Sequence, residues 1–76
     1  MKEFIETIAK QLVDDPSTVV VTEEEVEGRI VFKIKVDKRE VGKLIGKQGR
    51  TAQSLRTILS AIAAKSGKRV RLEILD

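Results

Sequence analysis

The sequence has 76 residues, 41% of them hydrophobic, and no cysteine, histidine, tyrosine or tryptophan; its net charge is +3. A chain of this length forms one small domain over residues 1–76, and without cysteine or histidine it lacks disulfides, thiolate metal sites and the usual nucleophile and general base. We therefore expect no enzyme, no metal and no cofactor. Residues 1–28 carry 2 basic and 8 acidic side chains (−6), whereas residues 29–76 carry 13 and 4 (+9), and this basic half favours a polyanion such as nucleic acid, although a solvated surface has the same composition.

The first half of the chain predicts a helix followed by a hairpin. Apolar residues recur at helical spacing over residues 1–13, and Pro16 ends this helix because proline disfavours helical backbone in the residue before it. The β-branched residues 19–22 predict a strand. After a turn at residues 27–28, residues 29–36 alternate apolar and mostly basic side chains, which predicts a half-buried strand paired with the first.

A short helix is predicted next. Asp37 and Glu40 form a capping-box pattern, in which two side chains at the start of a helix satisfy its free amides. This pattern predicts a helix that begins at Lys38 and is ended by Gly46.

The last third of the chain predicts a longer helix and a final strand. The helix begins near residues 49–50, residues 66–67 (Ser-Gly) end it, and residues 69–74 alternate as a strand does. The apolar positions that give this helix its spacing are Ala52, Leu55, Ile58, Leu59 and Ile62.

The resulting order, α-β-β-α-α-β, predicts an α+β fold. A strand, two helices and a strand that returns to the same sheet form a crossover, so the final strand is expected parallel to residues 29–36. The expected architecture is a three-stranded mixed sheet with three helices packed on one face. Phe4 and Phe32 are the only aromatic residues, and both are expected in the core.

Residues 41–53, VGKLIGKQGRTAQ, hold three glycines and three basic residues. A nucleotide phosphate loop is excluded, because Gly42 and Gly46 are separated by three residues instead of four and Gln48 stands at the serine or threonine position. Two interpretations remain: a tight corner between helices, or a turn whose backbone binds a ligand. Amides at the start of a helix point outward at its positive dipole end and, with Lys47 beside them, suit a phosphodiester backbone.

Residues 41–49, VGKLIGKQG, resemble the signature of the KH domain, whose GXXG loop clamps about four nucleotides of single-stranded nucleic acid. The family pattern is an apolar-rich helix that ends in Ile-Gly-x-x-Gly with a basic residue in the loop, which residues 45–49 match. The order of elements is similar to the type II arrangement, and the resemblance covers the whole chain. It implies a type II KH domain similar to the small bacterial stand-alone KH proteins, which act as general RNA-binding factors.

The resemblance also implies a binding site. It places the loop on residues 46–49, the groove wall on the two flanking helices, and the short variable loop on residues 65–69. Arg56 and Arg71 could also touch the nucleic-acid backbone. For these two residues and for Lys43, a role as a solvated surface charge remains the alternative. The implied nucleic-acid contacts are Val41, Lys43, Ile45, Gly46, Lys47, Gln48, Gly49, Arg50 and Gln53.

The implied function is non-enzymatic binding of single-stranded RNA with low sequence specificity, as an RNA chaperone or post-transcriptional regulator. Without tyrosine or tryptophan the domain lacks aromatic stacking platforms, so one domain should bind modestly. Single-stranded DNA is the alternative ligand. The alternative class is a protein–protein module that forms a homodimer or a heterodimer with a larger KH protein, for which small residues such as Ala61 and Ala64 offer a surface. No apolar run approaches the ~18 residues of a membrane span and the N-terminus is too polar for a signal peptide, so we expect a cytoplasmic protein without a membrane partner.

Overall fold

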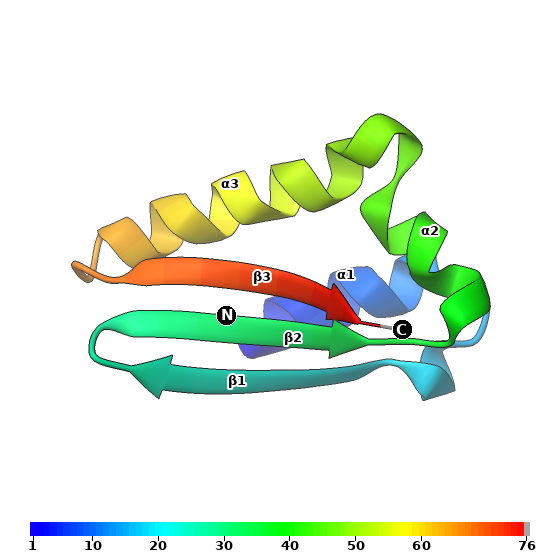
Figure 1. Cartoon of the computed structure of the whole chain (residues 1–76), viewed down its shortest axis with the longest axis horizontal. Helices are drawn as coiled ribbons and strands as arrows, with labels where there is room; N and C mark the ends of the chain where they lie inside the picture. Colours follow the sequence, from blue (N-terminus) through cyan, green and yellow to red (C-terminus); the bar gives the residue numbers. More distant parts are fainter. Residues whose placement is uncertain (76) are drawn as a thin grey trace.

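A computed structural model describes residues 1–75 and confirms the predicted order of helices and strands (Figure 1). Single-turn 3₁₀ helices precede β1, α2 and α3, at Pro16–Thr18, Lys38–Glu40 and Lys47–Gly49. No helix within the described residues is both long and apolar enough to cross a membrane. The main elements are α1 (Lys2–Leu12), β1 (Val20–Val26), β2 (Arg29–Lys35), α2 (Val41–Ile45), α3 (Arg50–Ala64) and β3 (Arg69–Leu75).

The three strands form one mixed sheet in the order β1-β2-β3. β1 and β2 are antiparallel, and the turn between them uses Glu27 and Gly28, which have φ values of 51° and 78°. β3 is parallel to β2, with Phe32 beside Leu72. The crossover predicted from the sequence is therefore confirmed, and β3 is an edge strand of the sheet.

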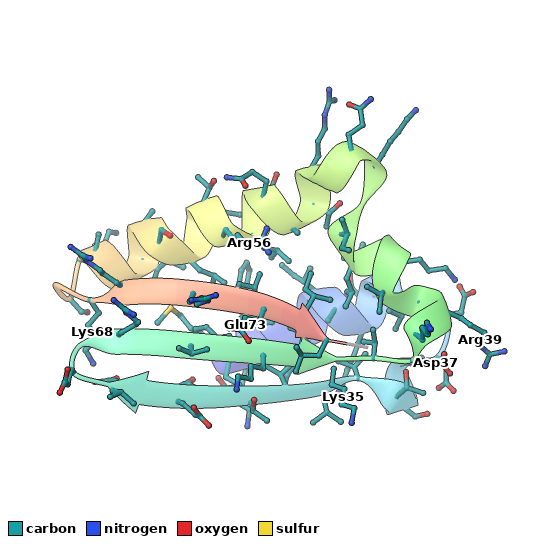
Figure 2. All side chains as sticks on the ribbon, in the orientation of Figure 1. Lys35, Asp37, Arg39, Arg56, Lys68 and Glu73 are labelled. Carbon is teal, nitrogen blue, oxygen red and sulfur yellow. The ribbon has the colours of Figure 1, made fainter. Side chains whose placement is uncertain are left out.

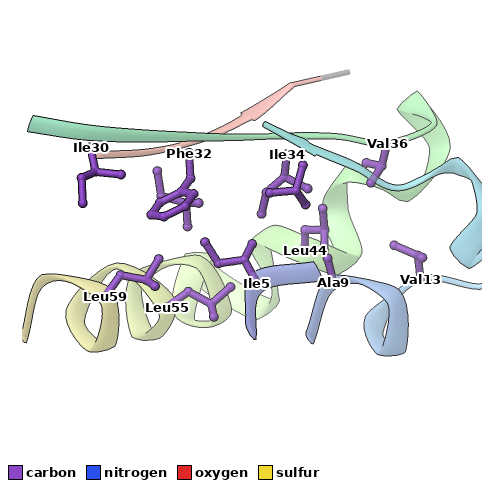
Figure 3. Packing of buried hydrophobic residues seen from close by; sticks show 12 residues of the cluster. Ile5, Ala9, Val13, Ile30, Phe32, Ile34, Val36, Leu44, Leu55 and Leu59 are labelled. Atoms are coloured by element: carbon purple, nitrogen blue, oxygen red, sulfur yellow. The ribbon is translucent and has the colours of Figure 1, made fainter. Parts of the chain in front are cut away.

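All three helices lie on one face of the sheet, and the core fills the space between the two layers (Figure 3). Ile30, Phe32 and Ile34 of β2 point into this space, where they meet Ile5 and Ala9 of α1 and residues of α2 and α3. In Figure 1 the sheet lies in front of α1, and no helix among residues 1–75 crosses its outer face. The predicted arrangement of three helices on one face is confirmed.

Phe4, which was expected in the core, is 40% exposed, and Ile58 and Ile62 of α3 are 44% and 42% exposed. The buried positions of α3 are Ala52, Leu55, Leu59 and Ala63, which form one narrow stripe. Ile58 and Ile62 lie on the flank of this stripe, and Phe4 lies on the flank of the buried positions of α1. The prediction for Phe4 was wrong because a small helix buries one stripe only, and the apolar surface of α1 is wider than that stripe.

The capping pattern at residues 37–40 is only half present. Asp37 accepts a hydrogen bond from the Arg39 amide at 3.0 Å, but the chain first makes a 3₁₀ turn, and α2 itself begins at Val41 instead of Lys38. The Glu40 carboxylate is buried and accepts the amides of Asp14 and Asp15 at 2.7 and 3.2 Å. Glu40 therefore ties the end of α1 to the start of α2, because those two amides are otherwise free.

Candidate nucleic-acid interface

The turn between α2 and α3 has a backbone shape that requires glycine. Gly46 has φ 79° and ψ 173°, a combination that is essentially restricted to glycine. Gln48 and Gly49 follow in the left-handed region, with φ values of 58° and 74°. Hydrogen bonds from the Gly46 amide to the Gly42 carbonyl and from the Gly49 amide to the Gly46 carbonyl close the turn. The Gly-x-x-Gly spacing thus forms a compact loop between two helices.

Gly46 also lies against the first turn of α3. A β-carbon at this position would lie 2.2 Å from Thr51 Oγ1 and 3.0 Å from the Thr51 amide nitrogen. Only a residue without a side chain permits this approach. At Gly49 an added β-carbon would meet no atom within 4 Å, so the two glycines serve different purposes.

The outer surface of the loop is basic and open. Lys47, Gln48 and Arg50 are exposed, and among the described residues neither Lys47 nor Arg50 forms an ion pair. α3 has 15 residues, its N-cap is Gly49, and no side chain caps its first amides. Its first turn contains no acidic residue. The Arg50 amide donates to the Lys47 carbonyl, so what converges on this place is the positive end of the helix dipole and two cationic side chains, which is an arrangement suited to phosphate.

A groove lies between α3 and the edge strand β3. It has a volume of about 620 Å³ and is lined by Arg56 and Ser60 of α3 and by residues 70–75 of β3. In Figure 2, Arg56 extends from α3 towards β3, and its Nη2 donates to the Leu72 carbonyl at 3.4 Å. Gln53 lies three residues before Arg56 on the same side of α3. This side of α3 therefore runs from the groove towards the loop.

The edge strand presents free backbone groups to the groove. The Arg69 amide donates to Gly28 and the Leu75 carbonyl accepts from Val36, so the odd-numbered residues of β3 bond to β2. In a parallel ladder the alternate residues then direct their amides and carbonyls to the other side. Those residues are Val70, Leu72 and Ile74, of which the Leu72 carbonyl already accepts the hydrogen bond from Arg56. These backbone groups were not among the predicted contacts, although the last strand of a crossover can lie at the edge of its sheet.

The structure brings most of the predicted contacts together at one end of the molecule. Gly46, Lys47, Gln48 and Gly49 form the loop, Ile45 beside it is 39% exposed, and Arg50 and Gln53 are exposed on the first turns of α3. Val41 is half-buried and packs against the core. Leu44 is fully buried, as expected for a core residue.

Lys43 is engaged elsewhere. Its ammonium is hydrogen-bonded to the Asp14 carboxylate and lies 3.8 Å from Glu40 Oε1. The hydrogen bond to Asp14 raises the pKa of Lys43 above its usual value, with a further contribution from the negative charge of Glu40. Lys43 therefore has a structural role between α1 and α2, and its contact with nucleic acid stays a prediction.

A Gly-x-x-Gly turn between two helices, inside a β-α-α-β core preceded by a helix and a strand, defines a type II KH domain. Residues 2–74 match the protein family described as "KhpA/KhpB, KH domain". The chain belongs to this family.

Curated relatives match the chain along its full length. The RNA-binding protein KhpA of Aquifex aeolicus is 55% identical over 76 residues, which are 100% of this chain and 96% of that protein. The KhpA proteins of Listeria monocytogenes and Clostridium acetobutylicum are 45% and 49% identical, and the matches cover 100% and 99% of this chain and 100% of each relative. These relatives are named as RNA-binding proteins and not as enzymes, in agreement with the expectation that the chain is not an enzyme.

A solved structure shares the fold. The chain superposes on Era, in a crystal structure with MgGDPNP and nucleotides 1506–1542 of 16S ribosomal RNA, with a TM-score of 0.57 and 25% sequence identity. The match covers 97% of this chain and 28% of the Era chain, so the likeness concerns one part of that larger protein.

Proposed function

We propose that this protein binds single-stranded RNA, without catalysis, through the α2–α3 loop and the adjoining groove. The observation that carries the proposal is the open basic loop at the uncapped start of α3, next to a groove lined by the free edge of β3. The names of the KhpA relatives support RNA as the ligand, and so does the RNA present in the Era structure.

Each part of the site has its own task. The glycines at 46 and 49 let the RNA backbone approach closely, while Lys47 and Arg50 attract its phosphates. Ile45 offers an apolar surface beside the loop, and Val41 supports it from α2. Gln48, Gln53 and the free amides and carbonyls of β3 hydrogen-bond bases or sugars in the groove.

Low sequence specificity follows from the same set of side chains and backbone groups. The site has no aromatic side chain for stacking, and backbone groups on an edge strand form hydrogen bonds with more than one base. Such binding suits an RNA chaperone or a post-transcriptional regulator in the cytoplasm, with residues 1–76 acting as one unit. Single-stranded DNA is the competing ligand, because no contact in the site is restricted to the ribose 2′-hydroxyl.

Titration with a short single strand, made both as RNA and as DNA, tests this proposal. A footprint of about four nucleotides allows ~2–3 phosphate contacts, so the slope of log K against log salt is expected between roughly −1.4 and −2.1. Tighter binding of the RNA strand supports RNA as the ligand. Equal binding of both strands favours a general single-strand binder, and no binding of either refutes the proposal.

A second candidate function, self-association, is favoured by an apolar surface that we call the α1/α3 strip. Ile8 and Leu12 of α1 and Ile58 of α3 line a shallow hollow of about 330 Å³. Phe4 and Ile62 extend these two rows by one helical turn, and both are exposed. We propose that a second copy of this chain or another KH protein covers the strip. Ala61 and Ala64 are also exposed; Ala61 lies one turn from Ile58 at the margin of the strip, whereas Ala64 lies on the other side of α3 from Ile62.

A further inference from the structure

The outer face of the sheet carries a second concentration of positive charge. Ile30, Phe32, Ile34 and Leu72 point into the core, so the residues that alternate with them point away from the helices. This outer face has five basic and two acidic side chains, a balance of +3. The basic residues are Arg29, Lys33, Lys35, Arg69 and Arg71, and the acidic residues are Glu24 and Glu73.

Most of these cations have no partner within residues 1–75. Arg71 Nε lies 3.1 Å from Glu73 Oε1, and this is the only ion pair on the face. Arg29 lies directly beside Arg69 across the ladder, and like charges in that position destabilise a sheet. A surface that serves solubility alone mixes both signs. An uncompensated pair of arginines on neighbouring strands is instead suited to an anion placed between them.

The outer face and the groove meet at β3. Arg71 and Glu73 belong to both, because they line the groove and also stand on the outer face. A strand that leaves the groove therefore reaches the basic face by crossing one edge strand. Three strands at about 4.8 Å spacing make this face roughly 10 Å wide, so a single phosphodiester chain can lie on it.

We propose that the outer face of the sheet binds the phosphate backbone of RNA that extends beyond the groove. This inference rests on the proposed function, since the same RNA strand occupies both surfaces. The contact is electrostatic and independent of sequence, because arginine and lysine on an open sheet recognise phosphate and not base edges. A strand of about four nucleotides is held by the loop and groove alone. A longer strand also contacts the basic outer face of the sheet.

The test compares two single-stranded RNAs, one of about four and one of about 12 nucleotides, at ~50 and ~200 mM salt. The variant Arg29→Gln/Arg69→Gln removes the facing arginine pair, and Lys33→Gln/Lys35→Gln removes the lysines of β2. Lys2→Gln/Lys10→Gln is the matched control, which loses the same charge from α1. Each removed contact changes the slope of log K against log salt by about 0.7 for single strands, so either outer-face variant should flatten the slope for the long RNA by roughly 1.4.

The short RNA should bind both outer-face variants within about twofold of wild type, and the control should match wild type on both RNAs. Thermal stability should hold or rise in Arg29→Gln/Arg69→Gln, because a like-charge pair is relieved. If the long RNA shows the same affinity and slope with the outer-face variants as with wild type, the inference is overturned. Loss of short-RNA binding in those variants also overturns it, since the face would then belong to the groove. Failure of wild type to bind either RNA refutes the proposed function itself.

Discussion

Gly46 and Thr51 lie so close that no side chain fits between them. A β-carbon at residue 46 would stand 2.2 Å from Thr51 Oγ1 and 2.6 Å from Thr51 Cβ. Thr51 is β-branched and sits in the first turn of α3, so it cannot move aside without shifting that helix. The close approach of Gly46 to Thr51 therefore fixes the position of the loop relative to the start of α3, which we assign to phosphate binding.

Gly46→Ala should therefore cost more stability than Gly49→Ala. At Gly49 the only penalty is left-handed backbone, about 1–2 kcal/mol, whereas Gly46→Ala adds a steric clash to its own backbone strain. Urea unfolding of the two variants measures the difference. RNA titration should show a larger loss for Gly46→Ala, and equal costs in both assays would contradict the role given to the Thr51 contact.

The ion pair between Lys43 and Asp14 predicts an effect at high pH. The pKa of Lys43 is raised by its hydrogen bond to Asp14, so the charged amine favours the folded state. The contribution is complete below the ordinary lysine pKa, 10.5, and is lost as the pH rises through the higher value of the folded state. Lys43→Met should melt at a lower temperature than wild type near neutral pH, and the gap should close in strong alkali. A gap that persists or widens there would show that packing, and not charge, accounts for it.

Glu40 is expected to be the most sensitive polar residue of the fold. It is buried, and its Oε1 accepts the amides of Asp14 and Asp15. Glu40→Ala leaves both amides without an acceptor, which should cost about 2–4 kcal/mol of unfolding free energy. Glu40→Gln keeps one oxygen to accept them and should cost less. Chemical denaturation of both variants checks this order, and a harmless Glu40→Ala would refute the tie between α1 and α2.

Self-association should depend on the α1/α3 strip. Phe4→Ser/Ile62→Ser removes its two exposed ends, while Ala64→Ser changes the side of α3 opposite Ile62 and is the control. Sedimentation at micromolar concentration should show a dimer for wild type and the control and a monomer for the strip variant. Linked grooves can raise avidity by about 10²–10⁴, so the strip variant should also bind long RNA more weakly. A strictly monomeric wild type that still binds a short RNA with nanomolar affinity would contradict this account.

The sequence predicted the fold well because its periodicities are strong and its turns are marked. Alternation in β2 and the glycines that follow α2 and α3 placed β2, α3 and the end of α2 within one or two residues, whereas the start of α2 was predicted three residues too early. Phe4 was placed wrongly, since helical spacing identifies the apolar side of a helix but not how much of that side a small sheet covers. Glu40 was missed because its partners are amides about 25 residues away, and no local pattern records such a contact.

The candidate site was also predictable from the sequence only in part. The loop was predictable because Gly-x-x-Gly is a local pattern with a direct backbone meaning. The groove was only partly predictable, since the free edge of β3 depends on which strand lies beside it. Lys43 shows the limit most clearly, because its spacing from the loop says nothing of Asp14, which reaches it from the end of α1.

The most direct test of the central claim is a titration of Lys47→Asp/Gln48→Asp with a short single-stranded RNA. Both side chains are exposed and Gln48 has a backbone that aspartate tolerates, so the variant should fold with a stability change of about 0.5 kcal/mol or less. Thr7→Asp/Lys10→Asp, on the solvent side of α1, makes the same change in net charge and is the control. We predict that the loop variant loses RNA binding while the control keeps it. A folded loop variant that binds as tightly as wild type would show that RNA does not bind at this loop.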